Sequence, residues 1–434
     1  MPPSGSFSKV EPSNLQNRVD HWQSFKTGDF SQKWNSSKLI VREGQGAIAP
    51  LLNLLSDPTA DAETHWFTIR ALGNFSAPEV VTALAAQIDD TSIYINRTPE
   101  QTVELSEFVI ETLAAMGTLA IDVLSQLLQN PQRRLLAAKA LNQVRSSGVI
   151  PAMVSVAKDD DAMVRYYAID ALGSFHGAAV TPVLLTALSD SSAAVRKAAV
   201  MALGRRQDLQ ERHQLSQQLQ PLLWDVDLAV SCQTALALGR LGANDTLEAL
   251  QQILLSPHTP LNLRIDTVRA LEWYCDSSTT GTNTAMGQAF AVLTQALIEF
   301  GRDLENSSDL ENQDSDSAWG LTPQAKSQMM VAIIRVLGDL RHGSMAQDAT
   351  EILSQQLRHQ PPAIVLQAII MALASLGQPQ AFDALLPLLN HPADAVPIHT
   401  IAALKRLDPD HSLQRVTTYL AHLPEPPTDI LSLW

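Results

Sequence analysis

The sequence predicts an all-α fold, a right-handed α-solenoid built from about ten stacked helix pairs. Three observations lead to this fold class: a repeated helical segment, a second apolar helix after each copy, and an unusual apolar composition. Hydrophobic residues make up 45 % of the chain, but aromatic residues only 5 %. A core built mainly from Ala and Leu favours helices over strands.

The first helix of each pair closes on a Leu-Gly step or its equivalent. Six copies align without gaps, and the residue after the Leu serves as the anchor: Gly73, Asn142, Gly173, Gly204, Gly239 and Glu272. From Asn142 onward the anchors are 31, 31, 35 and 33 residues apart, a period typical of helical repeats. A small residue two positions before each anchor lets the next helix approach closely. We expect the glycine to end the helix in the left-handed conformation.

A second apolar helix follows each copy, as in VTPVLLTALSD at residues 180–190. Most of these segments end on Asp, Asn or Ser, and several continue into a proline that stops the helix: Pro58, Pro131, Pro257 and Pro392. One pair of such helices cannot bury its apolar face alone, so neighbouring pairs must stack.

Breaks in the repeat divide the chain into five segments. We expect a polar N-terminal lead-in and cap at 1–46, a first block of repeats at 47–301 and an acidic flexible insertion at 302–320. A second block of repeats follows at 321–421, and a C-terminal tail occupies 422–434.

Charge and cysteine content exclude several classes of function. The chain carries 30 Lys and Arg against 45 Asp and Glu, a formal net charge of −15. Nucleic acids and anionic membranes are bound by basic surfaces, so we expect neither as a partner. The longest apolar run, Ala363 to Leu376, is too short to cross a bilayer, so no membrane insertion is expected. The two cysteines, Cys232 and Cys275, indicate buried or half-buried thiols in a cytoplasmic protein.

No catalytic or metal-binding constellation stands out, so neither a catalytic residue nor an intrinsic cofactor is predicted. One charged feature recurs: an Arg lies eight residues before the anchor, at Arg134, Arg165, Arg196 and Arg264. Stacked repeats place these side chains in a row. Such a row suits carboxylates, such as the propionates of a tetrapyrrole or an acidic partner. The alternative is a structural ladder between repeats with Asp160, Asp161 and Asp190.

Aromatic residues gather on the early repeats. Trp66 and Tyr166 share the position seven residues before the anchor, where the next repeat has Lys197. A position that accepts Lys is at least partly exposed, so the aromatic pair is either a binding hot spot or edge packing. The predicted binding residues are Trp66, Arg70, Arg165, Tyr166, Arg196 and Arg264. Binding of a tetrapyrrole predicts an Arg and an aromatic residue that converge in a concave pocket, with Arg165, Trp66 and Tyr166 as the first candidates.

The repeat resembles a known family. DDDAMVRYYAIDALGSF and AVTPVLLTALSDSSAAVRKAAVMALG look like the short, Ala-rich HEAT-like repeats of E/F-type phycobilin lyase subunits of cyanobacteria, and ETHWFTIRALGNFSAPEVV is similar to their aromatic copies. The resemblance covers most of 47–407. The whole-chain layout also looks like a longer cyanobacterial HEAT-repeat relative that binds an A-type iron–sulfur carrier protein.

The resemblance implies a chaperone-like role. In E/F-type lyases the solenoid holds an open-chain tetrapyrrole and a phycobiliprotein subunit, whose own cysteine adds to the bilin. We therefore expect a protein-binding scaffold that assists bilin attachment or phycobilisome biogenesis, with a phycobiliprotein subunit as client and a phycobilin as ligand. If the chain is an enzyme, it is a phycobilin:cysteine lyase. The alternative is a non-enzymatic partner of an A-type iron–sulfur carrier.

Overall fold

The computed structural model describes residues 21–89, 99–209, 214–275, 283–307, 321–340 and 343–424. These residues form helices joined by turns, with no strand among them, as the sequence predicts. The chain divides into two compact units, unit 1 up to Ala202 and unit 2 from Leu203 onward.

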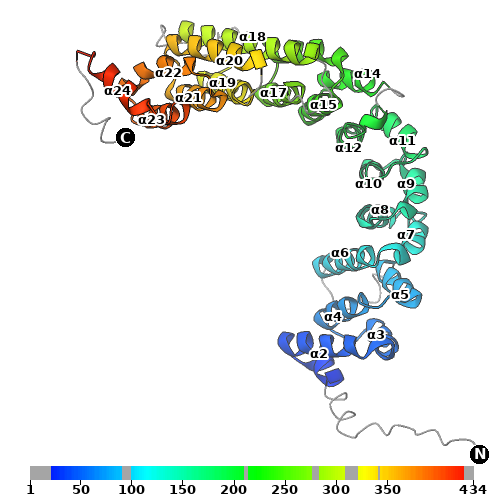
Figure 1. Cartoon of the computed structure of the whole chain (residues 1–434). Helices are drawn as coiled ribbons and strands as arrows, with labels where there is room; N and C mark the ends of the chain where they lie inside the picture. Colours follow the sequence, from blue (N-terminus) through cyan, green and yellow to red (C-terminus); the bar gives the residue numbers. More distant parts are fainter. Residues whose placement is uncertain are drawn as a thin grey trace, which may run out of the picture. The chain divides into compact units, whose positions relative to one another are not determined.

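Unit 1 consists of two layers of helices (Figure 1). The first helices of its pairs are α2 (Phe30–Arg42), α4 (Ala62–Leu72), α6 (Pro99–Ala115), α8 (Arg134–Gln143), α10 (Ala162–Leu172) and α12 (Ala193–Leu203), the last of which ends at the unit boundary. The second helices are α3 (Ile48–Leu55), α5 (Pro78–Asp89), α7 (Ile121–Leu127), α9 (Ile150–Val156) and α11 (Val180–Ala187). Helix α2 lies within the predicted N-terminal cap and packs on α4, so this part of the cap is a helix of the stack.

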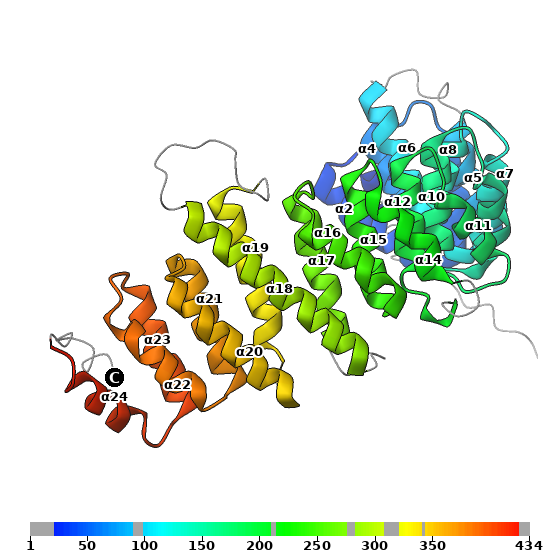
Figure 2. The ribbon, with the colours of Figure 1, turned by 90° about the horizontal axis from the view of Figure 1, so that it is seen from above.

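Unit 2 repeats the same arrangement (Figure 2). Its first helices are α15 (Leu228–Leu241), α17 (Leu261–Cys275), α19 (Pro323–Gly338), α21 (Ala363–Leu376) and α23 (Ala395–Leu407). Its second helices are α14 (Leu215–Leu219), α16 (Leu247–Leu255), α18 (Asn283–Ser307), α20 (Gly343–Gln356), α22 (Gln380–Leu385) and α24 (Ser412–Leu420). Because α18 reaches Ser307, the first residues of the predicted insertion are helical. Residues 308–320 and 425–434, which hold the rest of the insertion and most of the tail, lie outside the described residues.

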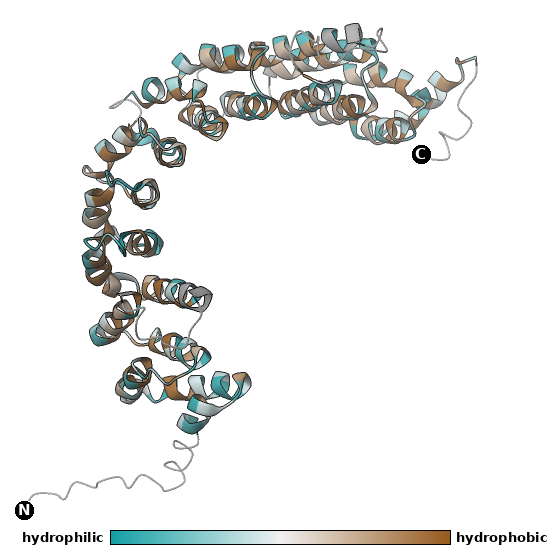
Figure 3. Cartoon of the chain, turned by 180° about the vertical axis from the view of Figure 1, so that it is seen from behind, coloured by the Kyte–Doolittle hydropathy of each residue, from teal (hydrophilic) through white to brown (hydrophobic). Residues whose placement is uncertain are grey.

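The core lies between the two layers of each unit. Hydrophobic and hydrophilic residues alternate around the helices (Figure 3), and in α10 the apolar side chains of Val164, Ile169 and Leu172 are buried. The N-terminus of α10 is capped by Asp161, whose carboxylate accepts a hydrogen bond from the Met163 amide. Burial of each large apolar side chain stabilises the fold by about 1.5–3 kcal/mol. This stabilisation is gained only when a neighbouring helix pair covers the side chain.

The repeat glycines have a different role from the predicted one. Gly173 has a φ of −59°, so it is right-handed, and Gly239 lies within α15. A Cβ on Gly173 would lie only 2.8 Å from the Cβ of Ala202, and one on Gly239 equally close to that of Ala270. The missing side chain of the glycine in one repeat therefore leaves room for the small residue of the next repeat to pack against it. Gly377, the glycine after Leu376 in a later copy of the repeat, does end its helix in the left-handed conformation, with φ of +67°.

Candidate functional site

Unit 1 carries a cluster of aromatic and cationic side chains on three successive first helices. We name these six side chains the aromatic–cation patch: Phe30, Trp34 and Lys38 of α2, Trp66 and Arg70 of α4, and Phe108 of α6. Two of them, Trp66 and Arg70, are among the predicted binding residues. The other four were not predicted as such.

An ion pair between a buried lysine of α2 and an exposed aspartate at the start of α4 links the two helices. Lys33 is almost fully buried, and its Nζ donates to both carboxylate oxygens of Asp61 at 3.0 and 3.1 Å. Asp61 also caps α4, because its Oδ1 accepts from the Thr64 amide. Partial burial works to raise the pKa of the Asp61 carboxyl, but the hydrogen bonds from Thr64 and Lys33 hold that pKa below its usual value. The two helices are thereby held in one register.

The patch is built on a single buried ring. Phe67 of α4 is fully buried, and its ring contacts the rings of Phe30 at 5.2 Å, Trp34 at 6.3 Å and Trp66 at 5.0 Å between centroids. Aromatic pairs in such tilted and edge-to-face geometries contribute about 0.5–1.5 kcal/mol each beyond their burial. The Phe67 ring therefore orients the aromatic side chains around it.

Two cations lie over one indole at the surface. The guanidinium of Arg70 lies 3.8 Å from the Trp34 ring centroid, and the Lys38 ammonium lies 5.1 Å from it. Within the described part of the chain, neither cation has a carboxylate partner. A guanidinium that lies over a ring keeps its N–H donors in the guanidinium plane, where they can bind a carboxylate with two hydrogen bonds. In a chain of net charge −15, these two cations beside one indole form a locally positive surface.

Aromatic surface adjoins these cations on both sides. Trp66 stacks on Phe108 at 4.9 Å with 16° between the ring planes, which joins α4 to α6. Phe30 stacks on Trp34 and is exposed. The patch therefore combines positive charge with large, rigid apolar area, the combination found at hot spots of protein interfaces.

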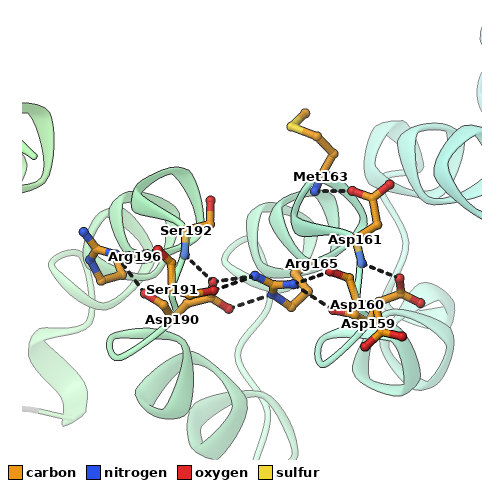
Figure 4. A network of polar contacts seen from close by, with 9 residues as sticks. All are labelled: Asp159, Asp160, Asp161, Met163, Arg165, Asp190, Ser191, Ser192 and Arg196. Atoms are coloured by element: carbon orange, nitrogen blue, oxygen red, sulfur yellow. Dashed lines mark hydrogen bonds and ion pairs between the residues drawn. The ribbon is translucent and has the colours of Figure 1, made fainter.

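Arg165 forms part of a structural ladder between repeats. Its Nε and Nη2 donate to the two carboxylate oxygens of Asp190, both at 2.8 Å, and its Nη1 donates to the Asp159 and Asp160 carbonyls (Figure 4). The hydrogen bonds to Asp190 raise the pKa of Arg165 further. Burial acts to raise the pKa of Asp190, yet Arg165 keeps it below its ordinary value. One repeat earlier, Arg134 pairs with Asp159 through a single hydrogen bond from its Nη1.

The remaining members of the Arg row are also engaged. Arg196 donates to the carbonyls of Asp190 and Ser191. Arg264 is fully buried and donates to the Ser256 carbonyl, and its burial lowers its pKa to about 10. The ladder between repeats therefore consists of Arg134 and Arg165, whereas Arg196 and Arg264 donate to backbone carbonyls. Its acids are Asp159 and Asp190, not Asp160 or Asp161.

The predicted convergence of Arg165, Trp66 and Tyr166 does not occur. Trp66 is on α4 and Tyr166 on α10, with α6 and α8 between them in the stack. Tyr166 is half-buried beside Tyr167, with ring centroids 5.3 Å apart, and burial raises its pKa. The common phase of Trp66 and Tyr166 reflects the repeat and not a shared pocket.

Three other features of the described residues concern metal binding, the two cysteines and the length of the helices. The described residues contain no group of His, Cys, Asp or Glu that would hold a metal ion. Cys232 is half-buried and Cys275 buried, as predicted, and burial raises the pKa of the Cys275 thiol to about 12. None of the helices described is long and apolar enough to span a bilayer.

The repeats identify the family. Three overlapping stretches, 121–204, 150–225 and 181–272, and a separate one, 330–429, match the family model of HEAT repeats, and together they cover more than half of the chain. The chain belongs to the HEAT-repeat family. No curated protein matches this HEAT-repeat chain.

Solved structures of karyopherins share its fold. The structure of Kap121p has a TM-score of 0.56 and 13 % identity, and the match covers 94 % of this chain and 47 % of that one. Kap121p bound to Pho4p gives 0.59 at 13 % identity, covering 94 % and 47 %. Kap121p bound to the extreme C-terminus of the protein phosphatase Cdc14p gives 0.58 at 14 % identity, covering 95 % and 47 %. The HEAT-repeat chain thus spans about half the length of these structures, and the likeness is one of fold.

Proposed function

We propose that this HEAT-repeat chain is a protein-binding scaffold that holds a client on the aromatic–cation patch. The observation that carries the proposal is the arrangement of Arg70 and Lys38 over Trp34, without a carboxylate partner among the described residues. A folded protein of net charge −15 has many acids available to pair with these two cations. Leaving both without such a partner beside exposed rings suits recognition of an external carboxylate.

The patch selects for a particular kind of client segment. Arg70 binds the carboxylate of an Asp or Glu side chain or of a chain terminus, and Lys38 adds a second charge. Phe30 and the stacked pair of Trp66 and Phe108 cover apolar side chains next to that carboxylate. Truncation of one Trp or Arg at the centre of such an interface costs about 2 kcal/mol or more of binding free energy.

The fold supports a scaffold role. A solenoid exposes an extended surface of successive helices, along which a client can be held without any catalytic group. Two of the structures of similar fold are of Kap121p bound to another protein, Pho4p in one case and the C-terminus of Cdc14p in the other.

For the client itself, the proposal follows the resemblance of the repeats to E/F-type phycobilin lyase subunits. The scaffold holds a phycobiliprotein subunit during bilin attachment or phycobilisome biogenesis. A phycobilin is the ligand that accompanies it, because its propionates offer Arg70 the same carboxylate chemistry. Any rate enhancement then comes from holding the bilin and the client cysteine together.

The test is a pull-down from a cyanobacterial lysate with three versions of the chain: wild type, Arg70→Glu and Arg269→Glu. Arg269 is a matched control, because it is an exposed arginine on α17 in unit 2. Wild type and Arg269→Glu are expected to retain phycobiliprotein subunits with long-wavelength visible absorption, and Arg70→Glu is expected to lose them. Equal retention by all three versions contradicts the assignment of the patch. A brown eluate that contains an A-type iron–sulfur carrier would identify that carrier, and not a phycobiliprotein, as the client.

A further inference from the structure

A second surface, in unit 2, has a different character from the aromatic–cation patch. It lies on the solvent-facing side of the first helices α19, α21 and α23, which pack side by side (Figure 2). We name it the C-terminal apolar surface and define it by six residues: Val331, Ile364, Ala368, Met371, Ile398 and Ala402. Ile364, Met371 and Ile398 are among the most exposed large hydrophobic side chains of the described residues.

The repeat brings these residues into register. Arg335, Met371 and Ala402 each lie two positions before a buried leucine of their helix, at Leu337, Leu373 and Leu404. Within α21, which contains no charged residue, Ala368 lies one turn from Ile364 and one turn from Met371. The small Ala368 side chain leaves a notch between two large ones. A ridge of side chains on an incoming helix fits such a notch.

One edge of the surface is basic. Arg335 and Arg406 lie near the C-terminal ends of α19 and α23, and both are exposed. Within the described ranges, neither guanidinium has a carboxylate partner. His399 adjoins Ile398, and its Nδ1 donates a hydrogen bond to the Ala395 carbonyl. The acids nearest to these arginines in sequence are Asp339 and Asp408, the C-cap residues of α19 and α23, and Asp408 is paired with Arg415.

We propose that the C-terminal apolar surface docks an amphipathic helix of a partner protein, with its apolar stripe on Ile364 and Met371 and a row of carboxylates facing Arg335 and Arg406. Helix-in-groove recognition uses apolar anchors one and two turns apart on the incoming helix, and a helix that crosses α19, α21 and α23 meets a new first helix about every two turns. Carboxylates on one side of the partner helix complement the basic edge and set its direction. A second copy of the chain is disfavoured as occupant, because two molecules of charge −15 repel each other. The surface lies in unit 2, so this proposal stands apart from the role of the aromatic–cation patch.

The test is a selection from a displayed library of helical peptides of about 20 residues, long enough to cross three neighbouring first helices. The full chain is the target, and Met371→Glu and Met163→Glu serve as variants. Met163 is the matched control, because it is an exposed methionine on a first helix of unit 1, 43 % exposed against 53 % for Met371. Selected peptides are expected to repeat apolar residues at helical spacing beside Asp or Glu. Binding should weaken about tenfold or more with Met371→Glu and stay unchanged with Met163→Glu.

Charge reversal tests the basic edge in the same assay. Replacing the acids of a selected peptide with Lys is expected to weaken binding to wild type, and Arg335→Glu is expected to restore part of it. The proposal is overturned if no peptide is selected, if Met371→Glu binds the selected peptides as wild type does, or if the acidic and Lys versions bind equally. Sedimentation velocity gives one more result that would overturn the proposal. If wild type is a dimer and Met371→Glu is a monomer, the C-terminal apolar surface is a contact between two copies of the chain.

Discussion

Moving one methyl group across the contact between α10 and α12 tests how the repeats stack. In wild type, the Cβ of Ala202 faces the bare Cα of Gly173, and a methyl on Gly173 would lie 2.8 Å from it. The single variant Gly173→Ala has two methyl groups in this space, and the double variant Gly173→Ala/Ala202→Gly has one again. Because Gly173 is right-handed, alanine itself is not strained there.

The expected magnitudes follow from this geometry. Overpacking of a close contact costs about 1–3 kcal/mol, and replacing glycine with alanine returns up to about 1 kcal/mol of backbone entropy. Gly173→Ala should therefore lower the free energy of unfolding by about 1–2 kcal/mol. The double variant should lose about 1–2 kcal/mol less than the sum of the two single variants, because the methyl groups no longer meet.

Hydrogen exchange of α10 and α12 measures this free energy locally, which suits a repeat protein whose pairs can open separately. Gly46→Ala is the matched control, since no atom lies within 4 Å of its added Cβ and its φ is not positive. It should leave protection unchanged or raise it slightly. If Gly173→Ala protects α10 and α12 as well as wild type does, or if the double variant loses the full sum, the close-contact explanation of the repeat glycines is wrong.

Three further predictions concern the ladder and the thiols. In urea titrations, Arg165→Ala should lower the stability of α10 and α11 by about 2 kcal/mol, because a charge-assisted pair with both side chains only 12 % exposed loses one partner. The control Arg269→Ala removes an arginine that is 63 % exposed and should cost at most about 0.5 kcal/mol. The folded pKa of Asp190 lies below its ordinary value of 3.8, so the stability it contributes is complete above that pH and is lost as the pH falls through the folded pKa; acid titrations should show a shallower loss in Arg165→Ala. In native protein at pH 8, iodoacetamide should modify Cys232 well before Cys275, whose pKa burial raises to about 12, and equal rates would contradict the buried position of Cys275.

The sequence predicted the fold because the repeat itself carries the information. Leu172 and Ala171 mark the buried side of α10, and the same pattern returns in each copy. The role of the glycines was predicted wrongly, because sequence shows where a glycine is and not which φ it adopts. Gly173 and Gly377 look alike after a Leu, yet only Gly377 is left-handed.

The candidate site was predicted only in part. Trp66 and Arg70 stood out within the repeat, but their partners come from outside the aligned copies. Trp34 lies in the lead-in, and Phe108 lies on α6, whose copy of the repeat is weak. The ion pair between Lys33 and Asp61, which fixes α2 against α4, spans 28 residues and has no counterpart in the repeat. Such contacts between unlike repeats leave no period in the sequence, so only the three-dimensional structure brings them together.

Photo-crosslinking tests the central claim, that a client is held on the aromatic–cation patch, most directly. Benzoylphenylalanine replaces Phe30 in one version of the chain and Trp224 in another, two exposed aromatic positions with exposed fractions of 58 % and 54 %. On irradiation with the client from the pull-down, the version labelled at Phe30 is expected to form a covalent adduct, and an added Arg70→Glu substitution should abolish that adduct. Crosslinking at Trp224 with none at Phe30 would show that the client is held elsewhere on the chain.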